Sequence, residues 1–246
     1  MPGPYRTVAS VLSRAPGGNS GAMLCRLSNG DRAVVKAASN RHGVRSCVAE
    51  FVVSAVGQLI GAPVCVVSIV DIPMDLEGQW YGEQMDAGLA SASLEVTGVL
   101  ESRSLEHSSD DDNERRHAGV AALYDWCYGG DPQWLYQTTR ANTIWSHDHG
   151  MYFPGAHVWT AQHLVAEVEA PHPLPMPLTG VSVAELHRLA DALEALALDD
   201  IGGVLNWVPA TWPIDDDDLR YLGWFLDERR LPTAGRLRTL AAGGAP

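Results

Sequence analysis

Lysine is almost absent from this chain of 246 residues. Of its 17 basic residues, 16 are arginine and one is Lys36. The chain is also rich in alanine and glycine, a composition that fits codon bias as one explanation for the avoidance, and the single retained ammonium group is the exception. Basic charge is scarce as well, because 30 acidic residues bring the formal net charge to −13. Such a field repels nucleic acid and anionic membranes, and we expect the chain to bind neither directly.

Cysteine is also scarce, and the spacing of the four cysteines excludes the common metal and redox motifs. No CxxC pair occurs, which disfavours a zinc site or a redox centre. We expect all of them to be reduced and buried as small apolar side chains in a reducing compartment. They are Cys25, Cys47, Cys65 and Cys127.

Long apolar runs of the membrane type are missing. The twenty residues from Phe51 to Val70 carry no charge, but Gly61 and Pro63 interrupt them. The first half has apolar residues at helical spacing and the second half is rich in β-branched residues, so a helix followed by a strand explains the segment better than a membrane span. The N-terminus lacks the apolar region of a signal peptide. We therefore expect a cytoplasmic protein.

The first part of the chain is predicted to be rich in β-strands around a single helix. Apolar residues at helical spacing predict that helix over residues 46–60, and Gly61 ends it. Gly-rich or Asn-Gly turns at 14–20 and 28–31 separate the first strands. The strands are expected at residues 5–13, 22–27, 32–36, 64–72 and 82–85.

The rest of the chain is predicted to be mainly helical. The polar, acid-rich stretch 102–116 is expected to be a mobile loop, and a helix is expected over 117–128. Four aspartates at 215–218 precede an apolar pattern, and they fit a helix N-terminus better than a metal site because acidic groups favour that end of the dipole. Arg229 and Arg230 are expected near the other end of the same helix.

Three features in the first part of the chain suggest phosphate chemistry. The glycine-rich turn Gly17–Gly21 lies between two predicted strands, and glycines allow backbone N–H groups to approach a phosphate closely. Lys36 follows fifteen residues after Gly21, at the end of a strand. Glu50 comes fourteen residues later, among apolar neighbours of the predicted helix. A half-buried carboxylate needs a partner, and Lys36 is the candidate.

Two aspartates complete an ordered set. Asp131 lies in a tight Gly-Gly-Asp-Pro loop, where a carboxylate can accept a hydroxyl proton. Asp148 ends a short strand just before His149 and Gly150, a position that suits a magnesium ligand. A zinc site from His147 and His149 would need further ligands. A glycine-rich turn, strand lysine, helix glutamate, loop aspartate and metal aspartate are together the parts of a kinase site.

With these residues the sequence resembles the HipA-like kinases, a divergent bacterial branch of the protein-kinase-like fold. The resemblance covers about Ser10 to Leu240 and is carried by GGNSGAMLC, AVVK, AEFVVSAVGQLIGAPV, YDWCYGGD and HDHGMYF. It implies an α+β, bilobal fold, with a small β-rich lobe over residues 1–86 and a larger, mainly helical lobe over 87–246. The implied activity is transfer of the γ-phosphoryl group of ATP, with Mg²⁺, to a serine or threonine hydroxyl of a protein.

The resemblance also implies a role for each residue of the set. Lys36 would bind the α- and β-phosphates, Glu50 would orient Lys36, Asp131 would orient or deprotonate the acceptor hydroxyl, and Asp148 would hold Mg²⁺. A hinge segment at 83–86 would meet the adenine. The residues implied to bind ATP are Gly18, Ser20, Gly21, Lys36, Gln84 and Met85.

The loop after Asp131 departs from the family pattern. The metal-binding asparagine of the family stands five residues after the catalytic aspartate, and Tyr136 occupies that position here. The interval to Asp148 is about two residues short, and closing the gap within the loop brings Gln133 to the place of the asparagine. Gln137 is the other candidate. An amide oxygen of glutamine can ligate Mg²⁺.

Three functions stay open at this stage. The first is the protein kinase, with toxin–antitoxin pairing as in some relatives, where a partner protein would be the part that contacts DNA. The second is a pseudokinase-like module that binds nucleotide or a partner protein without transfer. The third is a small-molecule kinase similar to aminoglycoside phosphotransferases, of whose His-Gly-Asp loop only Gly130 and Asp131 match.

Overall fold

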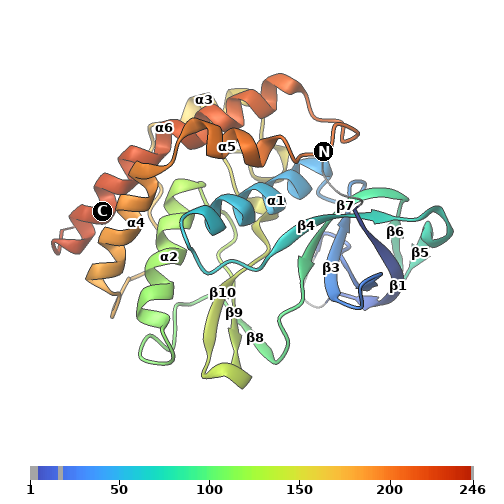
Figure 1. The fold of residues 1–246 in the computed structure, drawn as a ribbon, viewed down its shortest axis with the longest axis horizontal. Coiled ribbons are helices and arrows are strands. Elements are labelled where there is room, and N and C mark those ends of the chain that lie inside the picture. The colour runs from blue at the N-terminus through green and yellow to red at the C-terminus, as the bar shows by residue number, and fades with distance from the viewer. Residues whose placement is uncertain (1–4, 16–18, 245–246) are drawn as a thin grey trace.

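The computed structural model describes residues 5–15 and 19–244, and they form a β-rich part beside a mainly helical part (Figure 1). The β-rich part is a closed barrel with the strand order β1-β2-β3-β7-β4, to which a two-stranded hairpin of β5 and β6 is added. Its strands are β1 (Arg6–Arg14), β2 (Met23–Leu27), β3 (Arg32–Ala37), β4 (Val67–Ile72), β5 (Gly78–Trp80), β6 (Glu83–Met85) and β7 (Gly88–Leu94).

Strand β3 shows why this barrel can present a charged side chain beside an apolar core. Successive side chains of a strand point to opposite faces. Ala33 and Val35 belong to the buried core of the barrel, whereas Val34 and Lys36 line a cavity on the other face. The alternation therefore places Lys36 against the helical part of the molecule.

Strand β7 also alternates between side chains that face the barrel core and side chains that face the cavity, and it extends the barrel. It pairs antiparallel with both β3 and β4, and Lys36 lies opposite Ser91 in the register. The barrel therefore continues to Leu94, beyond the boundary at residue 86 that was expected between the two lobes.

Helix α1 (Val44–Leu59) joins the two parts, and it lies between the barrel and the remaining helices (Figure 1). Its bounds agree with the helix predicted over 46–60. Val48, Val52 and Val56 are completely buried in the larger core. Because this core also contains side chains of the helical part, α1 is fixed from several sides.

The helical part carries a small sheet at its border with the barrel. The sheet has the strand order β10-β9-β8. Elsewhere in the fold, the four cysteines are buried and free, as expected. None of the helices within the described residues is long and apolar enough to cross a membrane. The elements are β8 (Val99–Ser102), α2 (Asn113–Trp126), β9 (Trp134–Gln137), β10 (Thr143–Ser146), α3 (Ala161–Glu167), α4 (Val183–Ala195), α5 (Leu198–Leu205) and α6 (Asp216–Ala241).

Two sequence expectations about this part need correction. Helix α2 begins at Asn113, inside the stretch 102–116 that was expected to be a loop, because the buried Asn113 amide donates to the carbonyl of His107 and accepts from the N–H of Ile144. Helix α6 begins at the aspartate run as predicted, but it continues to Ala241, so Arg229 lies in its middle.

Candidate active site

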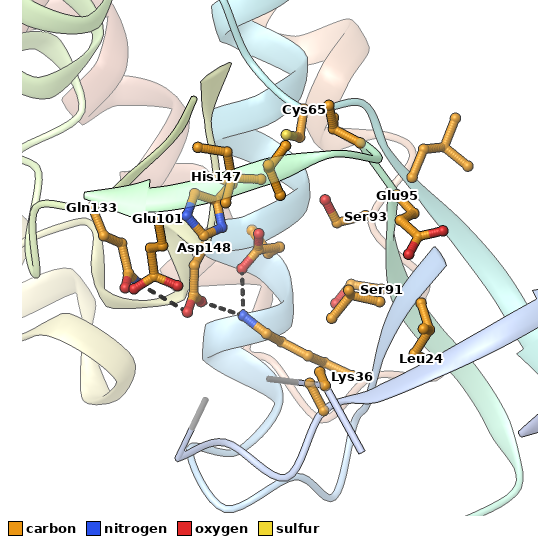
Figure 2. A pocket seen from close by; sticks show the side chains of 18 of the residues that line it. Leu24, Lys36, Cys65, Ser91, Ser93, Glu95, Glu101, Gln133, His147 and Asp148 are labelled. Atoms are coloured by element: carbon orange, nitrogen blue, oxygen red, sulfur yellow. Dashed lines mark hydrogen bonds and ion pairs between the residues drawn. The ribbon is translucent and has the colours of Figure 1, made fainter. Parts of the chain in front are cut away.

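A cavity of about 230 Å³ lies where β2, β3 and β7 of the barrel face α1 and the small sheet (Figure 2). One part of its wall is aliphatic and comes from Leu24, Val34, Leu94, Val96, Val99 and Leu135. The other part is polar and comes from Ser20, Lys36, Glu50, Ser91, Ser93, Glu95, Glu101, Gln133, His147 and Asp148.

Lys36 is the centre of the polar part. Its ammonium lies 2.7 Å from Glu50 Oε2 and 2.5 Å from Asp148 Oδ1, and Figure 2 shows the side chain reaching toward Asp148. Lys36 and Glu50 are both buried, whereas the side chain of Asp148 is 33% exposed. The structure therefore brings together three residues that the sequence analysis selected.

The electrostatics of this triad keep the lysine charged. Burial acts to lower the pKa of Lys36, but the negative charges of Glu50 and Asp148 outweigh it, and the pKa is raised. Burial also acts to raise the pKa of Asp148, but the ammonium of Lys36 lowers it to about 2. For Glu50, burial and the Asp148 charge raise the pKa against the influence of Lys36. One ammonium between two carboxylates leaves the site with an unsatisfied negative charge that attracts a cation.

Helix α1 positions Glu50 through a close approach to the segment after Asp148. A Cβ atom at Gly150 would lie 3.3 Å from Ser46 Cβ and 3.6 Å from Glu50 Oε2, so a side chain there would push against α1. Asp148 itself has a left-handed backbone, with φ of 53°. The Asp-His-Gly sequence thus lets the strand end turn sharply beneath the helix that carries Glu50.

Gln133 joins the triad, and it is the glutamine that the sequence left undecided. Its Nε2 donates to Asp148 Oδ2 over 3.0 Å. Gln137, the other candidate and the last residue of β9, donates instead to the carbonyl of Thr97 and does not line the cavity. Because the amide of Gln133 is also an oxygen donor, Gln133 and Asp148 can ligate one divalent cation together.

His147 and His149 flank Asp148; His149 is buried and His147 is partly buried. Burial lowers the pKa of His147 to about 4 and that of His149 to about 3, so both rings are neutral near pH 7. His147 Nε2 has no hydrogen-bond partner among the described residues. No group of three or more histidine, cysteine or acidic side chains among these residues is arranged to hold a metal.

Asp131 is exposed and lies outside the triad. Its side chain is 38% exposed, and Oδ1 accepts a hydrogen bond of 2.8 Å from Arg103, which follows β8. The loop before it requires glycine, because a Cβ at Gly130 would lie 2.3 Å from the carbonyl oxygen of Met151. Asp131, which was predicted to bind the acceptor, therefore lies two positions before Gln133, and its carboxylate pairs with Arg103.

The described part of the glycine-rich turn, residues 19–21, reaches the cavity through Ser20. Ser20 is buried and lines it, and the carbonyl of Ser20 accepts from the N–H of Arg41. Gly21 has φ of 80°, and a Cβ there would meet Glu83 Oε2 at 3.0 Å. Gly18, also predicted to bind ATP, lies outside the described residues.

Gln84 and Met85, expected to contact the adenine, are not brought to the cavity. Both lie in β6, where Gln84 bonds the exposed Gln79 and Met85 belongs to the barrel core. The connection that lines the cavity instead follows β7 and contains Glu95 and Val96.

The sequence analysis missed the residues that β7 contributes. Ser91 and Ser93 face the cavity while Ala90 and Ala92 are buried on the barrel side. The alternation Ala-Ser-Ala-Ser was a usable signal, because a period of two between small apolar and polar residues predicts a strand with one polar face. Arg103 carried no such signal, since its partner Asp131 is distant in the sequence.

Comparisons with known proteins identify the family and support the fold. The chain matches the sequence model of the HipA-like kinases over residues 8–153. The Helicobacter pylori proinflammatory kinase CtkA has a similar structure, with a TM-score of 0.63 and 10% identity over 98% of this chain and 97% of that chain. The Golgi casein kinase with Mn and ADP bound is similar with a TM-score of 0.51 and 10% identity, over 98% of this chain and 76% of that one. No curated protein sequence matches the chain. The predicted α+β, protein-kinase-like fold is thus confirmed.

Proposed function

The chain belongs to the HipA-like kinase family, and on this premise we propose that it transfers the γ-phosphoryl group of ATP to a hydroxyl group. The observation that carries the proposal is the position of Lys36, whose ammonium contacts both Glu50 and Asp148 at the edge of the cavity. In kinases a lysine that pairs with a helix glutamate contacts the nucleotide phosphates, and an aspartate binds the metal ion.

Lys36 and Glu50 provide charge and position. The buried pair holds the ammonium in one place before ATP binds, so that little rearrangement is needed when the phosphates meet it. The triphosphate would lie beside Ser20, which lines the same cavity, and beside Gly21, which follows it. Phosphoryl transfer depends mainly on such positioning and on neutralisation of the phosphate charge.

Asp148 and Gln133 fit a magnesium ion. Mg²⁺ in kinases is held by one or two protein oxygen ligands together with phosphate oxygens, and this pair offers a carboxylate and an amide that already contact each other. When bound, the ion supplies positive charge to the phosphate oxygens. On binding ATP, Lys36 exchanges its contact with Asp148 for the phosphates, which frees that carboxylate.

The aliphatic wall is the proposed adenine site. Val34 on β3 and Leu94 at the end of β7 are among its members, and the connection through Glu95 and Val96 borders it. An apolar wall beside a partly exposed backbone segment can take the flat base by packing contacts, with a few polar groups fixing its orientation.

Asp131 is the proposed residue for the acceptor, a serine or threonine hydroxyl of a protein. Its carboxylate would accept the hydroxyl proton while the hydroxyl oxygen bonds to the γ-phosphorus and ADP leaves. Arg103 must give up its contact with Asp131 for this to happen. The pair is exposed, and separating such a pair costs about 1 kcal/mol or less.

Label transfer from γ-labelled ATP tests the proposal. The purified protein is incubated with labelled ATP and Mg²⁺, alone and with a cell extract, beside Lys36→Ala and Asp131→Ala. We expect transfer by the native protein and a loss of at least about 100-fold in both variants. Absence of transfer by the native protein would overturn the proposal.

The Arg103–Asp131 contact favours a second candidate, a module that binds nucleotide without transferring phosphate. In that case the arginine permanently neutralises the carboxylate that transfer requires. The same samples distinguish the two, because such a module gains thermal stability with ATP and Mg²⁺ but labels no acceptor. If ATP does not change the melting temperature, neither candidate stands.

A further inference from the structure

The carboxylate of Asp218, in the first turn of α6, binds two other parts of the molecule. Its Oδ2 accepts a hydrogen bond of 2.6 Å from Arg45, in the first turn of α1. Its Oδ1 accepts one of 2.7 Å from the backbone N–H of Ala161, the first residue of α3. The Asp218 side chain is only 9% exposed, so water and salt screen these contacts little.

Trp159 strengthens the same junction. Its indole N–H donates over 3.0 Å to the carbonyl of Arg45, and the Arg45 guanidinium lies 5.3 Å from the centre of the indole ring. Trp159 is completely buried. The start of α1 is therefore tied by its side chain to α6 and by its backbone to the segment that leads from Asp148 to α3.

This junction determines where Glu50 lies relative to Lys36. Arg45 precedes Glu50 by five residues on one continuous helix, and a helix moves largely as a rigid rod over that distance. The segment after Asp148 is fixed at its end by Ala161, while at its start Gly150 packs against Ser46 of α1. A shift at Arg45 would thus move Glu50 relative to both Lys36 and Asp148.

We propose that Asp218 is a positioning residue that holds α1 in the orientation in which Glu50 pairs with Lys36. Many protein kinases obtain this orientation by phosphorylation of the segment after the metal-binding aspartate, because the new phosphate pairs with arginines. Here a carboxylate from the C-terminal helix contacts both the arginine of α1 and the end of that segment. The inference rests on the proposed function for its catalytic consequence, whereas the positioning itself is independent of it.

The hydroxyl groups of the segment support this assignment. Between Asp148 and Ala161 the only hydroxyl-bearing residues are Tyr152 and Thr160. Tyr152 is buried, and the Thr160 hydroxyl lies 3.2 Å from the ring of His163. The segment thus offers few hydroxyl groups for a phosphate, and the contacts of Asp218 make one unnecessary.

The test compares Asp218→Asn with Asp217→Asn. The first substitution keeps an oxygen for the N–H of Ala161 but removes the charge that pairs with Arg45. The second is matched to it, because Asp217 lies in the same helical turn, is 78% exposed and pairs only on the surface with Arg220. In the transfer assay we expect kcat to fall at least about tenfold in Asp218→Asn with the KM for ATP changed less than about threefold, and Asp217→Asn to match the native protein.

Hydrogen exchange supplies a readout that needs no transfer activity. In Asp218→Asn we expect faster exchange in α1 and in residues 151–165, with α2 and α4 protected as in the native protein. Unchanged exchange and rate would overturn the proposal, and so would faster exchange throughout the molecule, since that reports general destabilisation. If the native protein transfers no phosphate but exchange rises only in these two segments, the proposed function fails and the positioning role stands.

Arg45→Gln provides a second route if Asp218→Asn folds poorly. It removes the other partner of the same contact, and we expect the same local exchange pattern. The double variant should lose no more activity than either single variant, because both act on one interaction. Losses that multiply in the double variant would overturn the assignment.

Discussion

The ammonium of Lys36 contacts the carboxylate of Glu50 over 2.7 Å, although a strand end, a loop and the first turns of a helix separate them in the chain. Each partner is placed by its own element. The alternation of β3 points Lys36 away from the barrel core, and α1 carries Glu50 on a buried face. The contact therefore reports the relative position of barrel and helix.

Replacing Lys36 by methionine should reduce both stability and transfer. The substitution leaves Glu50 buried without its partner, and breaking a buried pair costs about 3–5 kcal/mol. Thermal and urea unfolding measure this loss. The double variant Lys36→Met with Glu50→Gln should recover much of the stability, since the buried Glu50 charge is removed and Asp148 is partly exposed, but none of the transfer. Recovery of transfer in the double variant would contradict the role of Lys36.

Gln133→Ala should weaken the use of Mg²⁺. The side chain contacts Asp148 directly, so its loss should raise the Mg²⁺ concentration for half-maximal rate by about tenfold. Gln137→Ala is the matched control, because this glutamine lies at the far end of β9 and contacts Thr97 instead. A magnesium titration of the transfer rate decides between them, and equal shifts in both variants would refute the assignment to Gln133.

Gly130→Ala should distort the loop that carries Asp131. The added Cβ would lie 2.3 Å from the backbone oxygen of Met151, and relieving this overlap should destabilise the protein by about 2 kcal/mol. Gly203→Ala is the control: within the described part of the chain nothing lies within 4 Å of its Cβ position. That change should be neutral or stabilising by up to about 1 kcal/mol, because alanine favours a helix. Equal melting temperatures for both variants would contradict the close packing at Gly130.

Acid should destabilise the protein through buried histidines, of which His117 on α2 is one. Burial lowers the pKa of His117 to about 4 in the folded protein, against about 6.5 in an unfolded chain. The folded state thus binds fewer protons than the unfolded state. The stabilisation that neutral His117 contributes is therefore fully present above about pH 6.5 and is lost as the pH falls toward about 4. The loss amounts to about 3 kcal/mol at most.

The variant His117→Gln isolates this contribution. Its unfolding free energy, measured by urea titration between pH 4 and pH 7, should vary less steeply with pH than that of the native protein. His187→Gln should keep the native slope, because His187 is exposed on α4. A native slope in His117→Gln would show that this ring does not resist protonation.

Local sequence patterns were sufficient for much of the fold and for the triad. The helix at 46–60 and the strand before Lys36 follow from apolar spacing, and the lone lysine pointed to a site because its residue type is so rare in this chain. Glu50 was recognisable because a carboxylate among apolar helix residues needs a partner. These inferences depend on neighbours close in sequence.

The remaining features depend on contacts between distant segments. Gln84 was expected at the adenine because its strand follows the buried β4, but the hairpin of β5 and β6 is an addition to the barrel and the chain returns through β7. The Arg103–Asp131 and Arg45–Asp218 contacts join segments far apart in the chain. No periodicity encodes such pairs, and only the packed structure reveals them.

The most direct test of the account is phosphoryl transfer by Asp148→Asn at saturating ATP, with ATP affinity measured on the same samples. The substitution keeps the shape of the side chain but removes the charge that Lys36 contacts and that would hold Mg²⁺. We predict that ATP still binds, that transfer falls by at least about 100-fold, and that added Mg²⁺ does not restore it. Equal transfer by Asp148→Asn and the native protein would contradict the central claim that this cluster is a phosphotransferase site.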